Sequence, residues 1–312
     1  MTIESGKFKS GFVTIIGRPN AGKSTLVNAL VGHKVAIVTP KPQTTRNRIQ
    51  GIVNREDAQI VLIDTPGLHR AANPLGRQMM NEVRQSMEGI DILSLLVDSS
   101  VNFGARDREA IDWARRFHGT KFLLLNKIDR IPKERLLPLI ELYTKELEFA
   151  EVIPISALKE DGLGDLVKSW ISYLPENAPN FPADQYTDQP ERFLAAEYIR
   201  EKAILSTREE IPHSVAVLVD SFEESDKLLR IRATIYVEKE GQKGILIGKG
   251  GEMMKKIGTE ARKDLEELLG IKIFLELFVK VQTNWRQKPN LIRQMDWRHQ
   301  LEDLGERQSD AE

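Results

Sequence analysis

Short apolar runs alternate with amphipathic segments along the first half of the chain. Six runs rich in valine, isoleucine and leucine have the length of buried strands, and the segments between them carry apolar residues at helical spacing. The predicted strands are 12–16, 49–54, 59–63, 92–97, 121–125 and 151–155, and the predicted helices are 25–31, 73–88, 106–117, 132–149 and 163–173. This alternation predicts an α/β domain, a mostly parallel sheet with helices on both faces.

The pattern changes after residue 174. Residues 174–190 contain four prolines and no apolar period, which predicts a semi-rigid linker. Beyond it the order is helix, strand, strand, short helix, long helix, strand, which predicts an α+β domain. The longer elements of this second half are predicted at 192–207, 214–222, 228–237, 252–269 and 271–282.

The first predicted strand leads into the sequence GRPNAGKS, residues 17–24, which has the form G-x4-G-K-S and precedes a helix. Strand, glycine-rich turn and helix are the context of a phosphate-binding loop. Glycines let backbone N–H groups converge on phosphate oxygens, and the helix dipole favours an anion there. In such a loop Lys23 reaches the β and γ phosphates and the Ser24 hydroxyl coordinates Mg²⁺. The alternative is a turn that binds nothing.

Two further motifs follow predicted strands. Asp64 begins the sequence DTPG and has the position of a Walker B aspartate, which holds Mg²⁺ through water. In the sequence NKID, residues 126–129, the Asp129 carboxylate can accept the paired N–H donors of guanine, which adenine lacks. Taken singly, the first motif could be a turn and Asp129 a helix N-cap. Their order favours a guanine nucleotide site where the parallel strands end.

A second candidate site is the sequence GKGG, residues 248–251, between two predicted helices. Such a G-x-x-G turn lets the backbone approach a nucleic-acid strand while lysines meet the phosphates. Alone it could be an ordinary turn, but the order of elements and the preceding Ile-Leu-Ile favour RNA binding. Basic residues flank it, although any one of them could belong to a solvated face: Lys243, Lys249, Lys255, Lys256, Lys280, Arg286 and Lys288.

Composition and charge narrow the possible domain organisation, kinds of site and location of the protein. The 312 residues suffice for two domains, and the net charge of −1 conceals 12 Lys/Arg against 7 Asp/Glu between residues 241 and 300. The absence of cysteine excludes disulfides, thiolate metal sites and a cysteine nucleophile. The chain starts without an apolar signal region, and no run approaches the roughly 18 apolar residues of a membrane span. We therefore expect a cytoplasmic protein.

Five segments resemble, in order and spacing, the five elements of a small GTP-binding domain: residues 17–24, Thr44-Thr45, residues 64–67, residues 126–129 and Ser156-Ala157-Leu158. The second half resembles a type II KH domain. Joined at this length, the two resemble the Era family of bacterial GTPases over essentially the whole chain. The resemblance implies a P-loop GTPase domain at 1–175, a linker at 176–190, a KH RNA-binding domain at 191–300 and an acidic tail at 301–312. It also implies GTP or GDP contacts from Gly17, Asn20, Ala21, Gly22, Lys23, Ser24, Thr25, Asp64, Thr65, Pro66, Gly67, Asn126, Lys127, Asp129, Ser156, Ala157 and Leu158.

The resemblance further implies that Ser24, Thr45 and Asp64 hold Mg²⁺, with Thr44 the less favoured switch residue. It assigns catalysis to Lys23, Thr45 and Gly67. Leu68 stands where Ras-like proteins have a water-orienting glutamine, so unaided GTP hydrolysis should be slow. Asn20 resembles the residue of family members that are assisted by K⁺. The implied RNA contacts are Ile247, Gly248, Lys249, Gly250, Gly251, Lys255 and Lys256.

The implied function is a GTPase switch that binds the 3′ end of small-subunit (16S) ribosomal RNA and helps the 30S subunit mature. A monomer that binds no DNA and associates with the inner membrane only peripherally is also implied. Two related classes are disfavoured. A tRNA-modifying GTPase would need a C-terminal cysteine, and this sequence has no cysteine. A tandem GTPase would have two phosphate loops, and this sequence has one. The remaining alternative is a ribosome- or RNA-docking module in which GTP hydrolysis is incidental.

Overall fold

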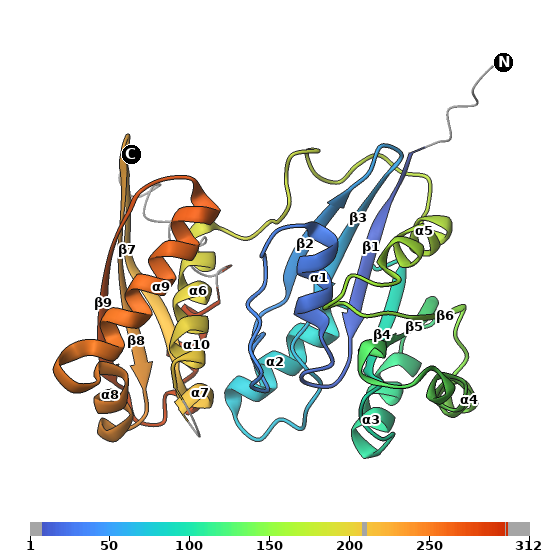
Figure 1. Cartoon of the computed structure of the whole chain (residues 1–312), viewed down its shortest axis with the longest axis horizontal. Helices are drawn as coiled ribbons and strands as arrows, with labels where there is room; N and C mark the ends of the chain where they lie inside the picture. The colour runs from blue at the N-terminus through green and yellow to red at the C-terminus, as the bar shows by residue number, and fades with distance from the viewer. Residues whose placement is uncertain (1–7, 208–210, 297, 299–312) are drawn as a thin grey trace. The chain divides into compact units, whose positions relative to one another are not determined.

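The computed structural model describes residues 8–207, 211–296 and 298. Within these residues the chain forms two compact units: the first comprises the residues up to Arg70 and Gln78–Asp188, and the second comprises Ala71–Arg77 and the residues from Gln189 onward. The predicted acidic tail, the residues before Phe8 and Trp297 lie outside the described residues. Figure 1 shows both units.

The first unit is built on a six-stranded sheet (Figure 1). Its strands in spatial order are β2 (Ile49–Asn54), β3 (Ala58–Asp64), β1 (Lys9–Ile16), β4 (Ile92–Asp98), β5 (Thr120–Asn126) and β6 (Glu151–Pro154). Every neighbouring pair is parallel except β2 and β3, which form the expected antiparallel hairpin. The predicted fold class is therefore confirmed, and the six predicted strands match the observed ones within a few residues.

Five helices cover this sheet: α1 (Lys23–Val31), α2 (Pro74–Gln85), α3 (Ala105–Arg115), α4 (Leu136–Glu146) and α5 (Leu163–Tyr173). One apolar core joins α1 and α5 to the sheet, and a second joins α2, α3 and α4 to it. The helix predicted at 132–149 is shorter than expected, because a 3₁₀ turn at Lys133–Arg135 precedes α4. Pro132 in extended conformation caps that turn.

The segment predicted as a linker lies along the first unit as far as Asp188. Thr187 forms an antiparallel bridge with Gly51 of β2, and the Ile52 N–H donates to the Tyr186 carbonyl at 2.9 Å. The Tyr186 ring stacks on His33 with ring centroids 4.6 Å apart. The segment thus continues the sheet beyond its edge strand, a role that its prolines and polar residues did not predict.

The second unit has a three-stranded sheet in the order β7 (Ala216–Ser225), β8 (Leu228–Val237), β9 (Ile273–Val281). The pair β7 and β8 is antiparallel, and β8 and β9 are parallel. The helices are α6 (Glu191–Leu205), α7 (Ile211–Ser214), α8 (Glu240–Ile247), α9 (Glu252–Leu269) and α10 (Pro289–Gln294). The four-residue α7 and the short α10 were not predicted, since neither is long enough to show a helical period.

The core of the second unit includes one face of α9 and a buried tryptophan. Ile257, Ala261 and Leu265 of α9 are fully buried, so the apolar stripe of this helix is part of the core. Trp285 is fully buried, and its indole N–H donates to the Ser214 carbonyl at 2.7 Å. Trp285 is therefore a core residue and has no surface for RNA.

Candidate nucleotide-binding site

The loop between β1 and α1 has the backbone geometry of a phosphate cradle. Gly22 has φ 103° and Asn20 has φ 63°, both in the left-handed region. A Cβ atom added at Gly22 would lie 2.3 Å from the Asn126 amide nitrogen, and one at Gly17 would lie 2.3 Å from the Leu96 carbonyl oxygen. Only glycine fits at both positions, so the two glycines of the motif are required by packing as well as by the turn.

Lys23 lies within the loop with its amine turned back onto the backbone. Its Nζ donates to the carbonyl oxygens of Gly17 and Arg18 at 3.3 Å each, and the residue is 6% exposed. Burial lowers the pKa of Lys23 from 10.5 to about 8, although the charge of Asp64 acts in the opposite direction. A bound phosphate would supply the negative charge that favours the protonated amine.

Ser24, Thr45 and Asp64, the three predicted magnesium ligands, lie together. The Ser24 hydroxyl donates to Asp64 Oδ2 at 2.6 Å and lies 2.9 Å from the Thr45 hydroxyl, which donates to the same oxygen at 3.3 Å. Both threonines line the nucleotide cavity, but the Thr44 hydroxyl contacts the Lys41 carbonyl oxygen at 2.8 Å. Thr45 is the one whose hydroxyl contacts Ser24 and Asp64.

Asp64 has the surroundings of a cation ligand. Burial raises the pKa of this carboxyl group, while the charge of Lys23 and the hydrogen bonds from Ser24 and Thr45 oppose that shift. Its Oδ1 atom is buried and has no hydrogen-bond partner within the described part of the chain. A carboxylate with a spare oxygen beside two hydroxyls is a set of hard oxygen donors, which suits Mg²⁺.

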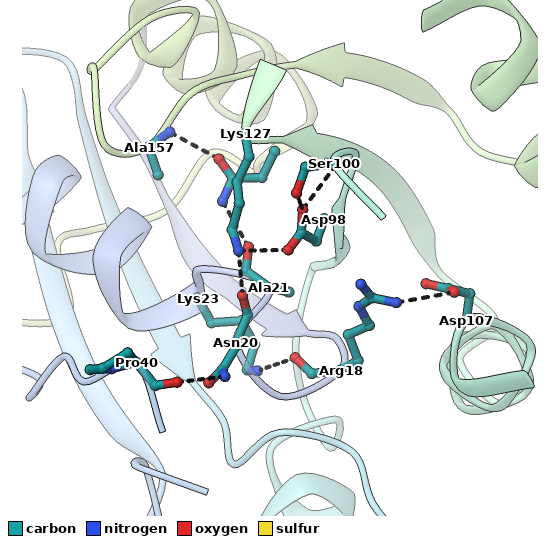
Figure 2. Close-up of polar contacts among 11 residues, drawn as sticks. Arg18, Asn20, Ala21, Lys23, Pro40, Asp98, Ser100, Asp107, Lys127 and Ala157 are labelled. Atoms are coloured by element: carbon teal, nitrogen blue, oxygen red, sulfur yellow. Dashed lines mark hydrogen bonds and ion pairs between the residues drawn. The ribbon is translucent and has the colours of Figure 1, made fainter. Parts of the chain in front are cut away.

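The base end of the site is held by the NKID motif (Figure 2). The Asn126 amide donates to the Ala21 carbonyl at 2.8 Å and accepts from the Ala157 N–H at 2.9 Å. The Ser156 hydroxyl donates to Asp129 Oδ1 at 2.6 Å, which fixes the carboxylate expected to face guanine. These contacts join the phosphate loop, β5 and the loop after β6 into one rigid frame.

Lys127 has a partner that sequence reasoning missed. Its amine donates to the Asn20 carbonyl at 2.7 Å and pairs with Asp98 Oδ2 at 2.6 Å. Burial alone would raise the pKa of Asp98, but hydrogen bonds from Lys127 and Ser100 hold it below its ordinary value. Asp98 ends β4, and its place at a strand end in line with Asp64 and Asn126 was the available signal.

Leu68 takes no part in the pocket, because its side chain is 3% exposed and packs into the core with Ile16 and Val83. Its N–H donates to the Gly17 carbonyl at 3.0 Å. A Cβ atom on Gly67 would lie 2.7 Å from Pro19 Cα, so the DTPG turn approaches the phosphate loop closely. Leu68 therefore cannot orient a water molecule, because its side chain is apolar and lies in the core rather than in the cavity.

A cavity of about 550 Å³ opens between these elements. The loop between α1 and β2, residues 32–48, supplies part of the cavity wall, and the Asn20 side chain donates to the Pro40 carbonyl of this loop at 3.0 Å (Figure 2). Thr65 stays behind the cavity wall and donates to the Ile15 carbonyl at 2.7 Å. The predicted residues that line the cavity are Asn20, Gly22, Lys23, Ser24, Thr25, Thr45, Gly67, Asn126, Lys127, Asp129, Ala157 and Leu158.

Sequence reasoning missed other residues of the cavity wall. Most come from the loop between α1 and β2 and from the end of β4 with the chain after it. These residues are Ile37, Val38, Thr39, Pro40, Gln43, Asp98, Ser100 and Val101, together with Pro19 in the phosphate loop and Arg130 after the NKID motif.

The G-x-x-G turn of the second unit lies between α8 and α9. Gly248, Gly250 and Gly251 all have positive φ, of 73°, 61° and 83°. A Cβ atom on Gly248 would lie 2.8 Å from Met253 Cβ, so a side chain there would force the two helices apart. Lys249 at the tip of the turn is exposed.

The basic residues around this turn differ in their freedom. Lys255 and Lys256 on α9 are exposed, and Lys256 has a loose contact of 3.9 Å with Glu260. Arg286 is already paired with Glu238, at 2.5 Å and 3.1 Å. The lysines, and not Arg286, are therefore the cations that the turn can offer to a polyanion.

The fold and the two sites define a P-loop protein with a guanine nucleotide site, followed by a KH domain. Family models agree: the model described as "50S ribosome-binding GTPase" matches residues 12–127, and the model described as "KH domain" matches residues 210–286.

Among similar proteins, the GTPase Era of Syntrophus aciditrophicus (strain SB) is 51% identical over 93% of this chain and 95% of its own. A crystal structure of Era in complex with MgGDPNP and nucleotides 1506–1542 of 16S ribosomal RNA is 42% identical, with a TM-score of 0.90 over 93% of this chain and 99% of that one. Aquifex aeolicus Era bound to GDP·AlF4⁻ is also 42% identical, with a TM-score of 0.89. The chain belongs to the Era family of GTPases, and the predicted hydrolase activity is confirmed at that level.

Proposed function

We propose that this protein is a GTP-dependent switch that binds the 3′ end of 16S ribosomal RNA and acts in maturation of the small ribosomal subunit. The observation that carries the proposal is the presence of both sites in one chain that superposes on an Era structure holding a GTP analogue, magnesium and that RNA end. The nucleotide cavity and the exposed glycine turn supply the two binding surfaces that such a switch needs.

In this proposal the residues of the first unit divide the work of the GTPase. Asn126 and Asp129 select guanine, Lys23 and the loop N–H groups bind the β and γ phosphates, and Gly67 contacts the γ-phosphate. Ser24, Thr45 and Asp64 would hold Mg²⁺, which supplies positive charge at the phosphoryl group being transferred. Loss of the γ-phosphate would release the segments around Thr45 and Gly67, as in other GTPase switches.

Hydrolysis by this site should be slow, because Leu68 is buried and no glutamine follows Gly67. We propose that K⁺ bound near Asn20 supplies part of the missing positive charge. The side-chain contact from Asn20 to the Pro40 carbonyl places a carbonyl oxygen and an amide at one point of the cavity rim. Rates of GTP hydrolysis should be higher in potassium than in sodium buffer, and equal rates would remove K⁺ from the mechanism.

The second unit is proposed to clamp single-stranded RNA through Ile247, Gly248, Lys249, Gly250 and Gly251, with Lys255 and Lys256 on the phosphates. KH domains hold about four nucleotides in this way. The contact should be salt-dependent, because each phosphate neutralised by lysine releases counterions.

The deciding experiment measures the affinity for a short RNA copying the 3′ end of 16S ribosomal RNA at fixed salt. It is done first with a non-hydrolysable GTP analogue and then with GDP, and a scrambled RNA serves as the control. Tighter, sequence-selective binding in the triphosphate state supports the switch. Equal binding in both states would leave a docking module in which hydrolysis is incidental, and absence of binding would overturn the ribosomal role.

Place of action and assembly belong to the same proposal. No helix of the described residues is long and apolar enough to cross a membrane. We propose a cytoplasmic monomer that binds no DNA and whose contact with the inner membrane is peripheral. Cell fractionation tests the location, and light scattering of the purified protein tests the oligomeric state. A stable dimer in solution would contradict the proposed monomer.

A further inference from the structure

Arg18, the second residue of the phosphate loop, directs its side chain away from the nucleotide cavity. Its guanidinium meets Asp107 in the first turn of α3, with Nη1 3.4 Å from Oδ2 (Figure 2). The two side chains are only 15% and 4% exposed. This pair is a polar contact that joins the phosphate loop to α3.

Asp107 is itself held from two further directions. The Gly104 N–H donates to Oδ2 at 2.9 Å, and the Tyr143 hydroxyl of α4 donates to Oδ1 at 2.9 Å. Tyr143 is buried, and burial together with the charge of Asp107 raises its pKa, so its hydroxyl stays protonated and remains a donor. The carboxylate therefore gathers donors from the phosphate loop, the start of α3 and α4.

The contact between Arg18 and Asp107 restrains the backbone of Arg18. Its carbonyl oxygen accepts from Lys23 Nζ at 3.3 Å and from the Ala21 N–H at 3.3 Å. A residue whose side chain is clamped at Asp107 has little freedom to rotate its peptide group. The direction of this carbonyl in turn sets the starting position of the lysine that serves the phosphates.

We propose that Asp107 and Tyr143 are positioning residues for GTP hydrolysis, acting through Arg18 on the phosphate loop and Lys23. Neither side chain lines the nucleotide cavity. Without Asp107, Arg18 would be a poorly hydrated cation with no carboxylate partner. Its side chain would move towards solvent or another partner, and the phosphate loop would shift with it. Charge stabilisation of the transition state depends on preorganised groups, so a small displacement of Lys23 slows the chemical step.

The effect should be confined to the phosphate end of the site. The base end has a separate carboxylate anchor, because Asp98 pairs with Lys127 and Lys127 holds the Asn20 carbonyl. Variants at Asp107 and Tyr143 leave those contacts in place. They should therefore lower kcat by a larger factor than they weaken GDP binding, because GDP keeps the contacts of its base and those of the loop N–H groups with its β-phosphate.

The test measures kcat for GTP hydrolysis, the Kd for GDP and the Tm. The variants are Tyr143→Phe, Asp107→Asn and Arg18→Gln in the full chain. We expect kcat to fall about tenfold for Asp107→Asn and Arg18→Gln and about threefold for Tyr143→Phe, with the Kd for GDP changed less than about twofold. The double variant Arg18→Gln/Asp107→Asn should be no slower than either single variant, since both break one chain of contacts.

The matched control is Arg115→Gln, which also loosens α3 from α4. Arg115 donates to the Glu146 carbonyl at 2.7 Å and to its carboxylate at 3.3 Å, on the exposed side of the helix pair. This variant should lower the Tm without lowering kcat. If Arg115→Gln slows hydrolysis as much as Tyr143→Phe, or if Tyr143→Phe hydrolyses GTP at the native rate, the inference is overturned.

This inference rests on the proposed assignment of residues 17–24 as the phosphate loop, which is tested apart from it. Lys23→Ala should abolish hydrolysis whether or not Arg18 is anchored. Native activity in Lys23→Ala would remove the assignment itself, whereas native activity in Tyr143→Phe would remove only the role of the anchor. Because Tyr143→Phe keeps the buried ring, it remains informative if Asp107→Asn fails to fold.

Discussion

At the scale of single residues, the site is defined by atoms that have no room to move. Gly67 approaches Pro19 so closely that even a methyl group at its α-carbon meets backbone. Asp98 is held by two donors, Lys127 and Ser100. Gly67 lies at the phosphate end of the cavity and Asp98 acts at the base end through Lys127, so a substitution at either residue should act mainly on its own end.

Gly67→Ala should separate the two nucleotide states. The new methyl group would lie 2.7 Å from Pro19 Cα, which pushes the DTPG turn away from the phosphate loop. We expect binding of GDP to change little, because that turn faces only the γ-phosphate, while hydrolysis falls by at least about tenfold. Fluorescence titration and single-turnover hydrolysis measure the two quantities, and equal loss of both would contradict the expectation.

Asp98→Asn should weaken GTP and GDP alike, by about tenfold, because Lys127 loses its charged partner at the base end. Since the pKa of Asp98 is lowered in the folded protein, its carboxylate stabilises the fold above the ordinary aspartate pKa of about 3.9. That stabilisation is lost as the pH falls through the lower folded value.

Urea unfolding of the wild type and of Asp98→Asn as a function of pH measures this contribution. The difference in unfolding free energy should be full at neutral pH and should shrink in acid, below about pH 4. A difference that grows on acidification would show that the sign is wrong.

At the scale of elements, both sites are turns before helices, and both depend on glycine for different reasons. In the phosphate loop, glycine avoids a collision with Asn126 and Leu96. In the turn between α8 and α9, glycines adopt positive φ and Gly248 lies against Met253. The sequence motifs give the positions of the glycines, and the structure shows which atoms a side chain at each position would collide with.

Gly248→Ala should damage the RNA site without touching the GTPase. The added methyl group meets Met253 and the residue has φ 73°, so the α8–α9 turn must open. RNA affinity should fall by about tenfold or more, while kcat for GTP stays native. Gly244→Ala is the matched control, because a Cβ atom there meets nothing within 4 Å, and it should bind RNA as the wild type does.

At the scale of the whole molecule, the chain forms two units, each with its own sheet. The boundary proposed from the sequence ends the GTPase domain at residue 175. In the structure, residues 176–188 pack along the edge of the first unit, with the Gln59 amide donating to the Phe181 carbonyl at 2.8 Å and Asn54 to the Gln185 carbonyl at 3.1 Å. The first unit is therefore longer than the proline pattern indicated.

A fragment of residues 1–188 should be more stable than one of residues 1–175. The shorter fragment loses the bridge to β2, the stack of Tyr186 on His33 and several hydrogen bonds worth about 1 kcal/mol each. We expect its unfolding free energy to be lower by about 3 kcal/mol. Urea denaturation measures the difference, and equal stability would show that the segment contributes nothing to the first unit.

Local physical chemistry accounts for what the sequence by itself determined. Strands, helices and the hairpin follow from the period of apolar residues, and the sites at Gly17–Ser24, Asp64 and Asn126–Asp129 follow from motifs whose residues lie close together in the chain. The choice of guanine follows in the same way, because one carboxylate can be matched to the donors of one base.

Only the tertiary structure decided the contacts that join distant segments. It placed the Thr45 hydroxyl beside Asp64, buried Trp285 and Leu68, paired Asp98 with Lys127 and joined Arg18 to Tyr143 through Asp107. No sequence period or spacing encodes these contacts, because each depends on which strand ends and helix faces the sheet order brings together. The closing of the sheet edge by residues 176–188 is of the same kind, since an edge strand presents unpaired backbone groups to whichever segment the fold delivers there.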